Sequence, residues 1–272
     1  MARRMFDLVE PIAVVTYMEH EPTEAVMALG LPRMWDAYFA GRAAPLGRDA
    51  PAEVVHALFF NFAPGEAARH IPRVWDLVTP ADANAARTAG SVAALRRLLG
   101  PLADGPGVDR AGSLLLRAGT SAATDGRGLY AAVRSLPVPD EPLARLWHGA
   151  NLLREHRGDG HVAALVAAGI GGTEAHVLHA LSMGMAASDF GRVSHLPAAQ
   201  LAAVVDGMRS RGLVGADGGF TDAGRALKDR IESQTDELAA PAYDVLDADE
   251  LDQLVADLTP LAAALVAGAD VP

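Results

Sequence analysis

The chain contains no cysteine. Disulfide bonds, thiolate metal sites and cysteine nucleophiles are therefore excluded, and the composition predicts a cytoplasmic protein. Lysine is nearly absent too, since Lys228 is the one lysine among 23 basic residues. Aromatic residues make up 5% of the sequence, and the formal net charge is −11. This acidic balance disfavours a general affinity for nucleic acid or for anionic membranes.

Half of the residues are hydrophobic, and apolar positions recur with helical periodicity along most of the 272 residues. This pattern predicts a mainly α protein. A chain of this length commonly divides into two domains. The glycine-rich patch at 119–128 is the best boundary, which gives an N-terminal helical domain over 1–122 and a C-terminal domain over 123–272. The uncharged run 162–173 is too short to span a bilayer, so we expect no membrane segment there.

A weak internal repeat links the two parts of the chain. Residues 33–42 match residues 145–154, so that Trp35 aligns with Trp147 and Arg42 with Arg154. A duplication predicts two related, winged-helix-like halves, with the Arg42 and Arg154 regions in equivalent places. Alanine-rich helices also produce such matches by chance, and that alternative stays open.

The segment 173–230 has the order of a winged helix-turn-helix. Helical stretches precede two short extended pieces, 213–214 and 219–220, on either side of an Ala-Asp-Gly turn at 216–218. We expect these pieces to form a small two-stranded β-wing. Thr221 or Asp222 can cap the long helix that follows to about 238, and another long helix covers about 247–267.

Two sets of motifs carry a family resemblance. "Arg-Gly-Leu" at 211–213 and "Thr-Asp-Ala-Gly-Arg" at 221–225 resemble the wing region of MarR-type regulators. The runs 39–47, 59–62 and 146–165, the last with LWH and REHRGDGHVAAL, resemble a poorly characterised group of actinobacterial helix-turn-helix proteins. The resemblance implies a helix-turn-helix fold but no specific activity.

The expected recognition helix, 197–211, is poor in groups that read DNA. Arg, Lys, Asn or Gln normally contact base edges, with cations on the phosphates around them. The first three turns offer only Gln200 and the acidic Asp206. Arg209, Arg211 and Arg225 are the candidate phosphate contacts. DNA binding is therefore possible but disfavoured.

A charged segment at 154–161 (Arg-Glu-His-Arg-Gly-Asp-Gly-His) interrupts an apolar helical region. Trp147 and Asn151 precede it on the same helical stripe. Arg154 and Arg157 are candidates for binding a carboxylate, sulfate or phosphate, because a guanidinium forks onto such groups. The alternative is a surface loop with ordinary Glu–Arg pairs, which contribute little stability.

Four further residues of this segment point to acid–base chemistry. His156 and His161 are candidates for proton transfer near neutral pH, and Glu155 and Asp159 are candidates for orienting an imidazole. The Gly-Asp-Gly sequence at 158–160 predicts a turn between helices at 141–156 and 161–168. Asp159 would then serve as an N-cap, which is its structural alternative.

A second polar group in the N-terminal half should face this segment across the pseudo-twofold axis. Its members are Tyr17, Arg42 and Asn61, the last flanked by phenylalanines in 59–62. A cleft between two domains is a common place for a ligand. The chain has no HExxH motif, no glycine-rich phosphate loop and no dinucleotide fingerprint, so we expect no metal and no cofactor.

Three functions fit these patterns. The leading hypothesis is a winged-helix scaffold that binds a polar or anionic small metabolite in an inter-domain pocket. It would perform acid–base chemistry such as elimination, cyclisation or isomerisation in specialised metabolism, although binding without catalysis stays open. One alternative is a ligand-responsive, dimeric transcriptional regulator that binds DNA. A further alternative is a protein-interaction subunit that supports an enzyme.

Overall fold

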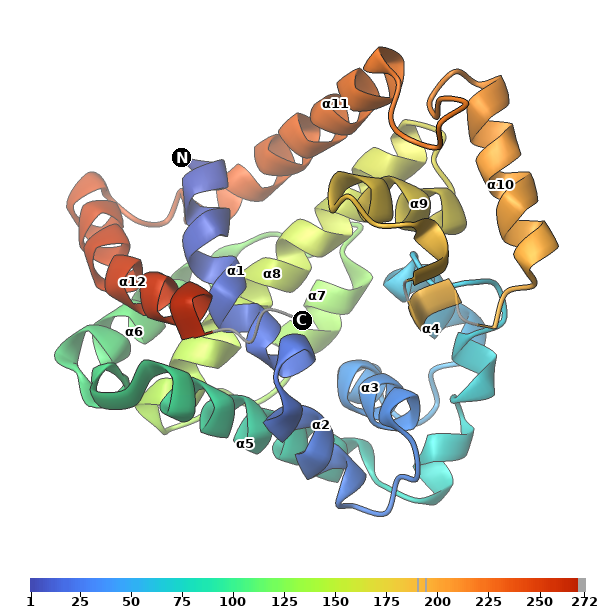
Figure 1. Ribbon diagram of the computed structural model, residues 1–272. Coiled ribbons are helices and arrows are strands. Elements are labelled where there is room, and N and C mark those ends of the chain that lie inside the picture. The colour runs from blue at the N-terminus through green and yellow to red at the C-terminus, as the bar shows by residue number, and fades with distance from the viewer. Residues whose placement is uncertain (190, 194, 269–272) are drawn as a thin grey trace.

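The computed structural model describes residues 1–189, 191–193 and 195–268. Within these residues the regular structure is helical (Figure 1), which confirms the prediction of a mainly α protein. In chain order the α-helices are α1 (Ala2–Met18), α2 (His20–Met27), α3 (Met34–Ala43), α4 (Ala52–Phe59), α5 (Pro80–Leu99), α6 (Pro106–Ser121), α7 (Gly128–Arg134), α8 (Pro142–Ala167), α9 (Gly172–Ser182), α10 (Ala198–Ser210), α11 (Asp222–Ala239) and α12 (Ala248–Gly268).

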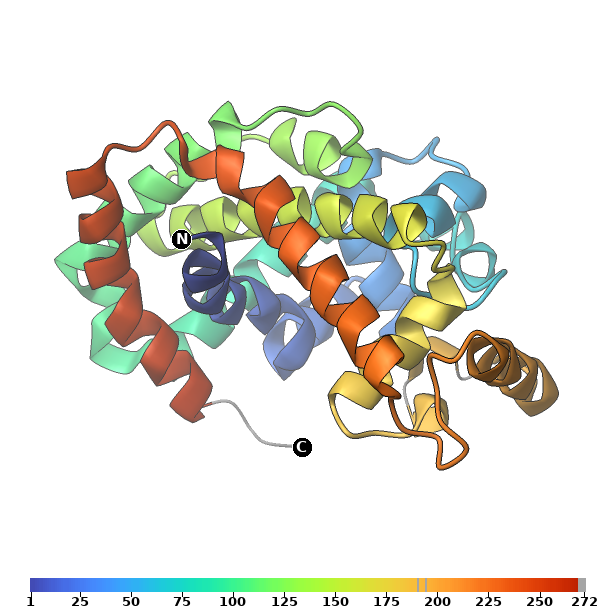
Figure 2. The same ribbon diagram turned by 90° about the horizontal axis from the view of Figure 1, so that it is seen from above.

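Helix α8 is the central element of the fold. It packs against α1, α5, α6 and α7, and α11 crosses it on another side (Figure 2). Because neighbours cover it almost all round, 16 of its 26 residues are buried. The helix runs without interruption through residues 158–160, so the turn expected there is wrong. Buried packing has overridden the low helix propensity of the two glycines.

The first hydrophobic core lies where α1, α5, α6, α8 and α12 meet. Leu95, Leu115, Leu146 and Leu258 are fully buried in it. Helix α6 packs closely against α8 at Gly112, because a Cβ on that residue would lie 3.1 Å from the backbone nitrogen of Leu146. This core draws on residues from both sides of residue 122. The division into domains 1–122 and 123–272 stays a prediction.

Helix α12 is long and apolar enough by length and composition to cross a membrane. Its apolar stripe is nevertheless part of the first core, with Leu254, Leu258, Leu261 and Leu265 buried at helical spacing. Spacing of this kind is typical of a helix that packs one face on a protein core. The burial of this stripe accounts for part of the hydrophobicity of α12, since 28% of its apolar window is buried.

The second core is aromatic and lies among α2, α3, α4 and the turns that follow α4. Phe39 stacks on Phe59 with ring centroids 5.6 Å apart, and Phe62 packs edge-on against Trp35 at 5.8 Å. Trp75 is also buried here. Aromatic pairs of this geometry add stability beyond the area that they bury. These aromatic contacts hold α2, α3, α4 and the turns after α4 together.

The third core holds the helix-turn-helix part together. It combines the end of α8 with α9, α10 and α11, and its buried side chains include Leu178, Met208 and Ile231. Helices α8 and α9 meet at 108° across a short break, and α10 packs against α9. The start of α9 lies directly on the aromatic core, because a Cβ on Gly172 would stand 2.1 Å from the carbonyl oxygen of Phe60.

The expected two-stranded β-wing is absent. Among the described residues no β-strand forms, and 213–220 contribute a single antiparallel bridge between Val214 and Phe220. Gly215, Gly218 and Gly219 fill the turn between them, and glycine weakens strands because it loses the most backbone freedom. Helix α11 begins at Asp222, two residues after Phe220, so the backbone pairing of this turn ends with the hydrogen bond from the Thr221 N–H to the Leu213 carbonyl at 3.3 Å. The prediction of winged-helix-like halves is therefore wrong.

The cap that follows the bridge was predicted correctly. The Thr221 hydroxyl accepts a hydrogen bond from the backbone N–H of Gly224 at 3.0 Å, which satisfies one of the first N–H groups of α11.

Candidate functional site

A buried carboxylate, Glu155, lies at the centre of a polar cluster where α1, α3 and α8 meet. Its side chain is 3% exposed. Tyr17 of α1 donates a hydrogen bond to its Oε1 at 3.3 Å, and Arg154 donates to the same oxygen at 3.1 Å. Arg42 of α3 reaches its Oε2 at 3.6 Å. The sequence placed Tyr17 and Arg42 opposite the charged segment, and the structure brings them together there.

Arg87 of α5 is a member of this cluster that the sequence analysis missed. Its residue is 5% exposed, and its guanidinium donates to the Thr16 hydroxyl at 3.0 Å and to the Tyr17 hydroxyl at 2.8 Å. It also lies over the ring of Trp147, 5.2 Å from the centroid. A signal was present in the sequence, because Arg87 shares a helical stripe with small residues that are buried in α5.

Arg192 joins the cluster from the connector between α9 and α10. It belongs to the 3₁₀ turn η6 (Gly191–Val193) and lies over the ring of Phe62, 5.7 Å from the centroid. With the Asn61 amide turned to satisfy both neighbours, its oxygen accepts from Arg192 and its nitrogen donates to the Phe59 carbonyl at 3.0 Å. Asn61 therefore both caps α4 and holds the connector.

The four guanidinium groups Arg42, Arg87, Arg154 and Arg192, together with Glu155 and the rings around them, are called the arginine cluster below. Aromatic rings hold the guanidinium groups in place. The Arg42 guanidinium lies 4.3 Å from the centre of the Phe59 ring, and that of Arg154 lies 4.9 Å from the centre of the Tyr17 ring. Arg42 also donates to the Tyr38 hydroxyl at 2.9 Å. Cation–π contacts of this kind strengthen when water is excluded.

The arginines keep Glu155 ionised despite its burial. Burial alone would raise the pKa of this carboxyl, but Arg42, Arg154 and Arg87 outweigh it and lower the pKa below its usual value. Burial, together with Glu155, raises the pKa of Tyr17, which stays protonated as a hydrogen-bond donor. The cluster therefore keeps a fixed charge near neutral pH.

Positive charge exceeds negative charge in the arginine cluster. Four guanidinium groups face two carboxylates, those of Glu155 and of Glu10, which accepts from Arg154 at 3.3 Å. Within residues 1–189, 191–193 and 195–268, neither Arg87 nor Arg192 forms an ion pair with a carboxylate. Burial, with Arg42 and Arg154 nearby, lowers the pKa of Arg192. Two positive charges are left over.

Buried polar atoms near this surplus also lack partners. Among the described residues, the Arg42 Nε, the Trp147 Nε1 and the Asn151 Oδ1 make no hydrogen bond. Asn151 is 2% exposed and lies one turn from both Trp147 and Glu155 on α8. Native proteins satisfy nearly all such atoms, so each exception needs an explanation.

His156 and Asp159 lie away from the arginine cluster, on the side of α8 that faces α7. The Asp159 carboxylate accepts from the backbone N–H of Tyr130 at 2.9 Å, so it caps α7 and not its own helix. Burial raises the pKa of Asp159 to about 6. The His156 ring packs edge-on against the Tyr130 ring, and burial lowers its pKa to about 4. Both side chains have structural contacts here.

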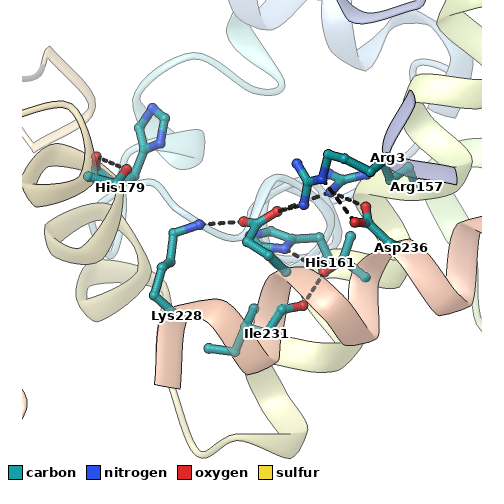
Figure 3. A network of polar contacts seen from close by, with 10 residues as sticks. Arg3, Arg157, His161, His179, Lys228, Ile231 and Asp236 are labelled. Atoms are coloured by element: carbon teal, nitrogen blue, oxygen red, sulfur yellow. Dashed lines mark hydrogen bonds and ion pairs between the residues drawn. The ribbon is translucent and has the colours of Figure 1, made fainter. Parts of the chain in front are cut away.

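Arg157 and His161 face α11 instead. Arg157 donates to Glu232 at 3.0 Å and to Asp236 at 2.9 Å, and Arg3 of α1 binds the same two carboxylates (Figure 3). This network ties α1, α8 and α11 together.

The tautomer of His161 follows from its neighbour. The Thr235 hydroxyl donates its one proton to the Ile231 carbonyl at 2.7 Å, so it accepts from the His161 Nδ1–H at 2.9 Å. Burial lowers the pKa of His161 to about 4. The imidazole is therefore neutral near pH 7 and is held by α11.

The candidate DNA contacts lie on the outside of the helix-turn-helix part. Gln200 is exposed near the start of α10. Arg209 is held by Asp206 at 2.7 Å and Arg211 by Glu174 at 2.7 Å, while Arg225 is 3.9 Å from Asp222. Each of the three arginines thus has an acidic neighbour. The outer face of α10 is otherwise formed largely by exposed alanines.

Comparisons with known proteins give one family. No curated protein and no solved structure matches the chain. A family model described as a helix-turn-helix family matches residues 2–272, which is nearly the whole sequence. The match agrees with the helix-turn-helix resemblance noted in the sequence. The chain belongs to this helix-turn-helix family.

Proposed function

We propose that the protein is a DNA-binding regulator of transcription that acts through α8, α9 and α10. The observation that carries this proposal is the family match over 2–272 together with the exposure of α10 beside α9. In helix-turn-helix proteins the second helix of the pair is the recognition helix and lies in the major groove, and here α9 and α10 would be the first and second helices of that pair. Gln200 on α10 can contact a base edge, and Arg209, Arg211 and Arg225 can contact phosphates.

The charge of this surface determines the expected strength of binding. Each phosphate contact releases counterions. The steepness with which DNA affinity falls as salt is added therefore reports how many cationic side chains contact phosphates. Three arginines give a shallow dependence and weak binding by one chain. A second copy of the chain bound to an adjacent half-site would double the number of contacts, so we propose that the DNA-binding form is a dimer.

A selection experiment tests this function. The full chain is used to select duplexes from a random pool, and binding of the selected DNA is followed by fluorescence anisotropy over a range of salt concentrations. Replacing Arg209, Arg211 and Arg225 together with alanine should weaken binding at least about ten-fold and make the salt dependence shallower. Arg4→Ala, at an exposed site of α1, is the matched control and should change neither quantity. If no duplex is enriched, or if the triple variant binds like the parent, the proposal is wrong.

Binding of an anionic metabolite is a second candidate function, and the arginine cluster is the observation that favours it. Its charges are fixed near neutral pH, which suits binding better than proton transfer. His161 and His156, the predicted acid–base groups, lie outside the cluster on other sides of α8. Anion binding is therefore the part of the metabolite hypothesis that these contacts support.

A further inference from the structure

The arginine cluster has the composition of an incomplete ion-pair network. Buried guanidinium groups are costly unless carboxylates or other acceptors neutralise them. Here Glu155 serves Arg42 and Arg154, while Arg87 contacts only hydroxyl groups and aromatic rings among the described residues. An added anion would supply the missing negative charge.

The geometry of the cluster suits an oxyanion. Its guanidinium groups come from α3, α5, α8 and the α9–α10 connector, so they converge from several directions. Among the described residues the Arg42 Nε has no hydrogen-bond partner, and the Arg42 side chain is 13% exposed. Arg154 is 23% exposed. Burial strengthens the charge–charge contacts of the cluster, while two of its guanidinium groups keep some exposure to solvent.

Neutral donors and acceptors accompany the charges. Within the described part of the chain the Trp147 Nε1–H has no acceptor, and the Asn151 amide is buried one turn further along α8. Binding sites typically combine an apolar lining with a few such polar groups that orient the ligand. The aromatic rings of Tyr17, Tyr38 and Phe59 provide that lining.

We propose that the arginine cluster binds a small oxyanion with two negative charges, a phosphate monoester or a dicarboxylate, and that the bound anion fixes the α9–α10 connector through Arg192. The charge of the ligand follows from the two unmatched guanidinium groups. The coupling rests on the proposed DNA-binding function, whereas the anion site does not.

Arg192 is the residue that would transmit occupancy to α10. Its connector already docks on the N-terminal segment, because the Arg192 carbonyl accepts from the Ala63 N–H at 3.2 Å and His195 contacts Glu66. An anion held by Arg42, Arg154 and Arg192 would join α3, α8 and the connector. Fixing the connector removes conformational freedom that DNA binding would otherwise have to restrict.

The site is tested first without DNA. Isothermal titration calorimetry of the full chain, in chloride buffer of constant ionic strength, uses inorganic phosphate and succinate as separate probes. We expect at least one to bind saturably below about 1 mM, a range typical for small ligands held by a few charged groups. Phosphate binding alone would indicate a phosphate ligand, and succinate binding alone a dicarboxylate. If neither probe shows saturable binding, the proposed site is wrong.

Variants at Arg192 assign the binding to the cluster. Arg192→Met keeps an unbranched apolar stem and should weaken binding at least about ten-fold, because a charge-assisted hydrogen bond is lost. Arg192→Lys keeps the charge and should retain most of the affinity. Arg73→Met, at a half-exposed arginine that pairs with Asp36 outside the cluster, should bind like the parent. Equal affinity of Arg192→Met and the parent would overturn the assignment.

The coupling is tested with the duplex selected above. The probe that binds should raise the DNA affinity of the parent at least about three-fold and should have no such effect on Arg192→Met. Saturable anion binding that leaves DNA affinity unchanged would overturn the coupling but not the site. If no duplex binds at all, the DNA-binding function fails, while the calorimetric result still decides the anion site.

Discussion

The two regions that could bind a ligand differ in the burial of their arginines and in the carboxylates that pair with them. On the outer face of the helix-turn-helix part, Arg209 and Arg211 are exposed and each is paired with a carboxylate. In the arginine cluster, Arg87 and Arg192 are buried or partly buried and have no carboxylate among the described residues. Unmatched positive charge is therefore inside the molecule, while the surface that would meet DNA is nearly balanced.

This difference follows from the energetics of the two environments. An exposed ion pair contributes little, because water already solvates both groups. A buried guanidinium loses that solvation, so an unmatched one persists only where something else stabilises the charge. The surface of α10 explains why binding to DNA by one chain should be weak. The arginine cluster explains why an anion is the ligand to look for.

The largest expected effect comes from removing a carboxylate in each region. Glu155→Gln leaves Arg42 and Arg154 without their buried partner and should lower the free energy of unfolding by about 3 kcal/mol. Asp206→Asn removes the exposed partner of Arg209 and should change it by less than about 0.5 kcal/mol. Urea denaturation followed by circular dichroism measures both values. Similar losses in the two variants would contradict the contrast between the regions.

Much of the helical pattern could be predicted from the sequence, because apolar periodicity is a local signal. Helices α10, α11 and α12 follow the expected stretches closely. The break expected at 158–160 was wrong for a physical reason. Gly-Asp-Gly is typical of a turn, but Gly160 lies inside α8, where a Cβ would stand 2.8 Å from the Arg127 guanidinium and 3.3 Å from the Leu238 Cβ. Close packing, and not a turn, therefore favours a small residue there.

The site could be predicted only in part. Tyr17, Arg42, Arg154 and Glu155 were identified because their residue types stand out near the repeated motif. Arg192 was not, since its role depends on the connector folding back to the Phe59–Phe62 region far away in the sequence. His161 was interpreted as a proton-transfer residue, although its partner Thr235 lies 74 positions further along the chain. Pairings at such distances follow from tertiary packing and leave no local pattern.

A smaller expected effect is the dependence of folding stability on pH, which arises from buried histidines. Burial lowers the pKa of His148, beside Arg87, to about 4. The unfolded chain takes up this proton below about 6.5, while the folded chain does so only near 4, so stability is lost as the pH falls through that window. His156 and His161 act in the same direction. Asp159, with its pKa raised to about 6, acts in the opposite direction.

The variant His148→Leu measures one share of this dependence. At pH 5 the parent should have lost about 1–2 kcal/mol of stability to His148, and the variant should not show that part of the loss. Urea denaturation at pH 7.5 and pH 5 gives the difference for each protein. If the two proteins lose the same stability between these pH values, His148 does not titrate as its burial implies.

Asp206→Asn should change the stability of the protein least, but it should change the affinity for DNA. Asp206→Asn leaves the fold almost unaffected, because Asp206 is exposed. It removes a negative charge from α10 and releases Arg209 from its 2.7 Å ion pair. On the proposed DNA-binding surface this should raise the affinity for the selected duplex by about three- to ten-fold at low salt and steepen the salt dependence. Anisotropy titrations of the parent and the variant test this, and an unchanged affinity would show that α10 does not face the DNA backbone.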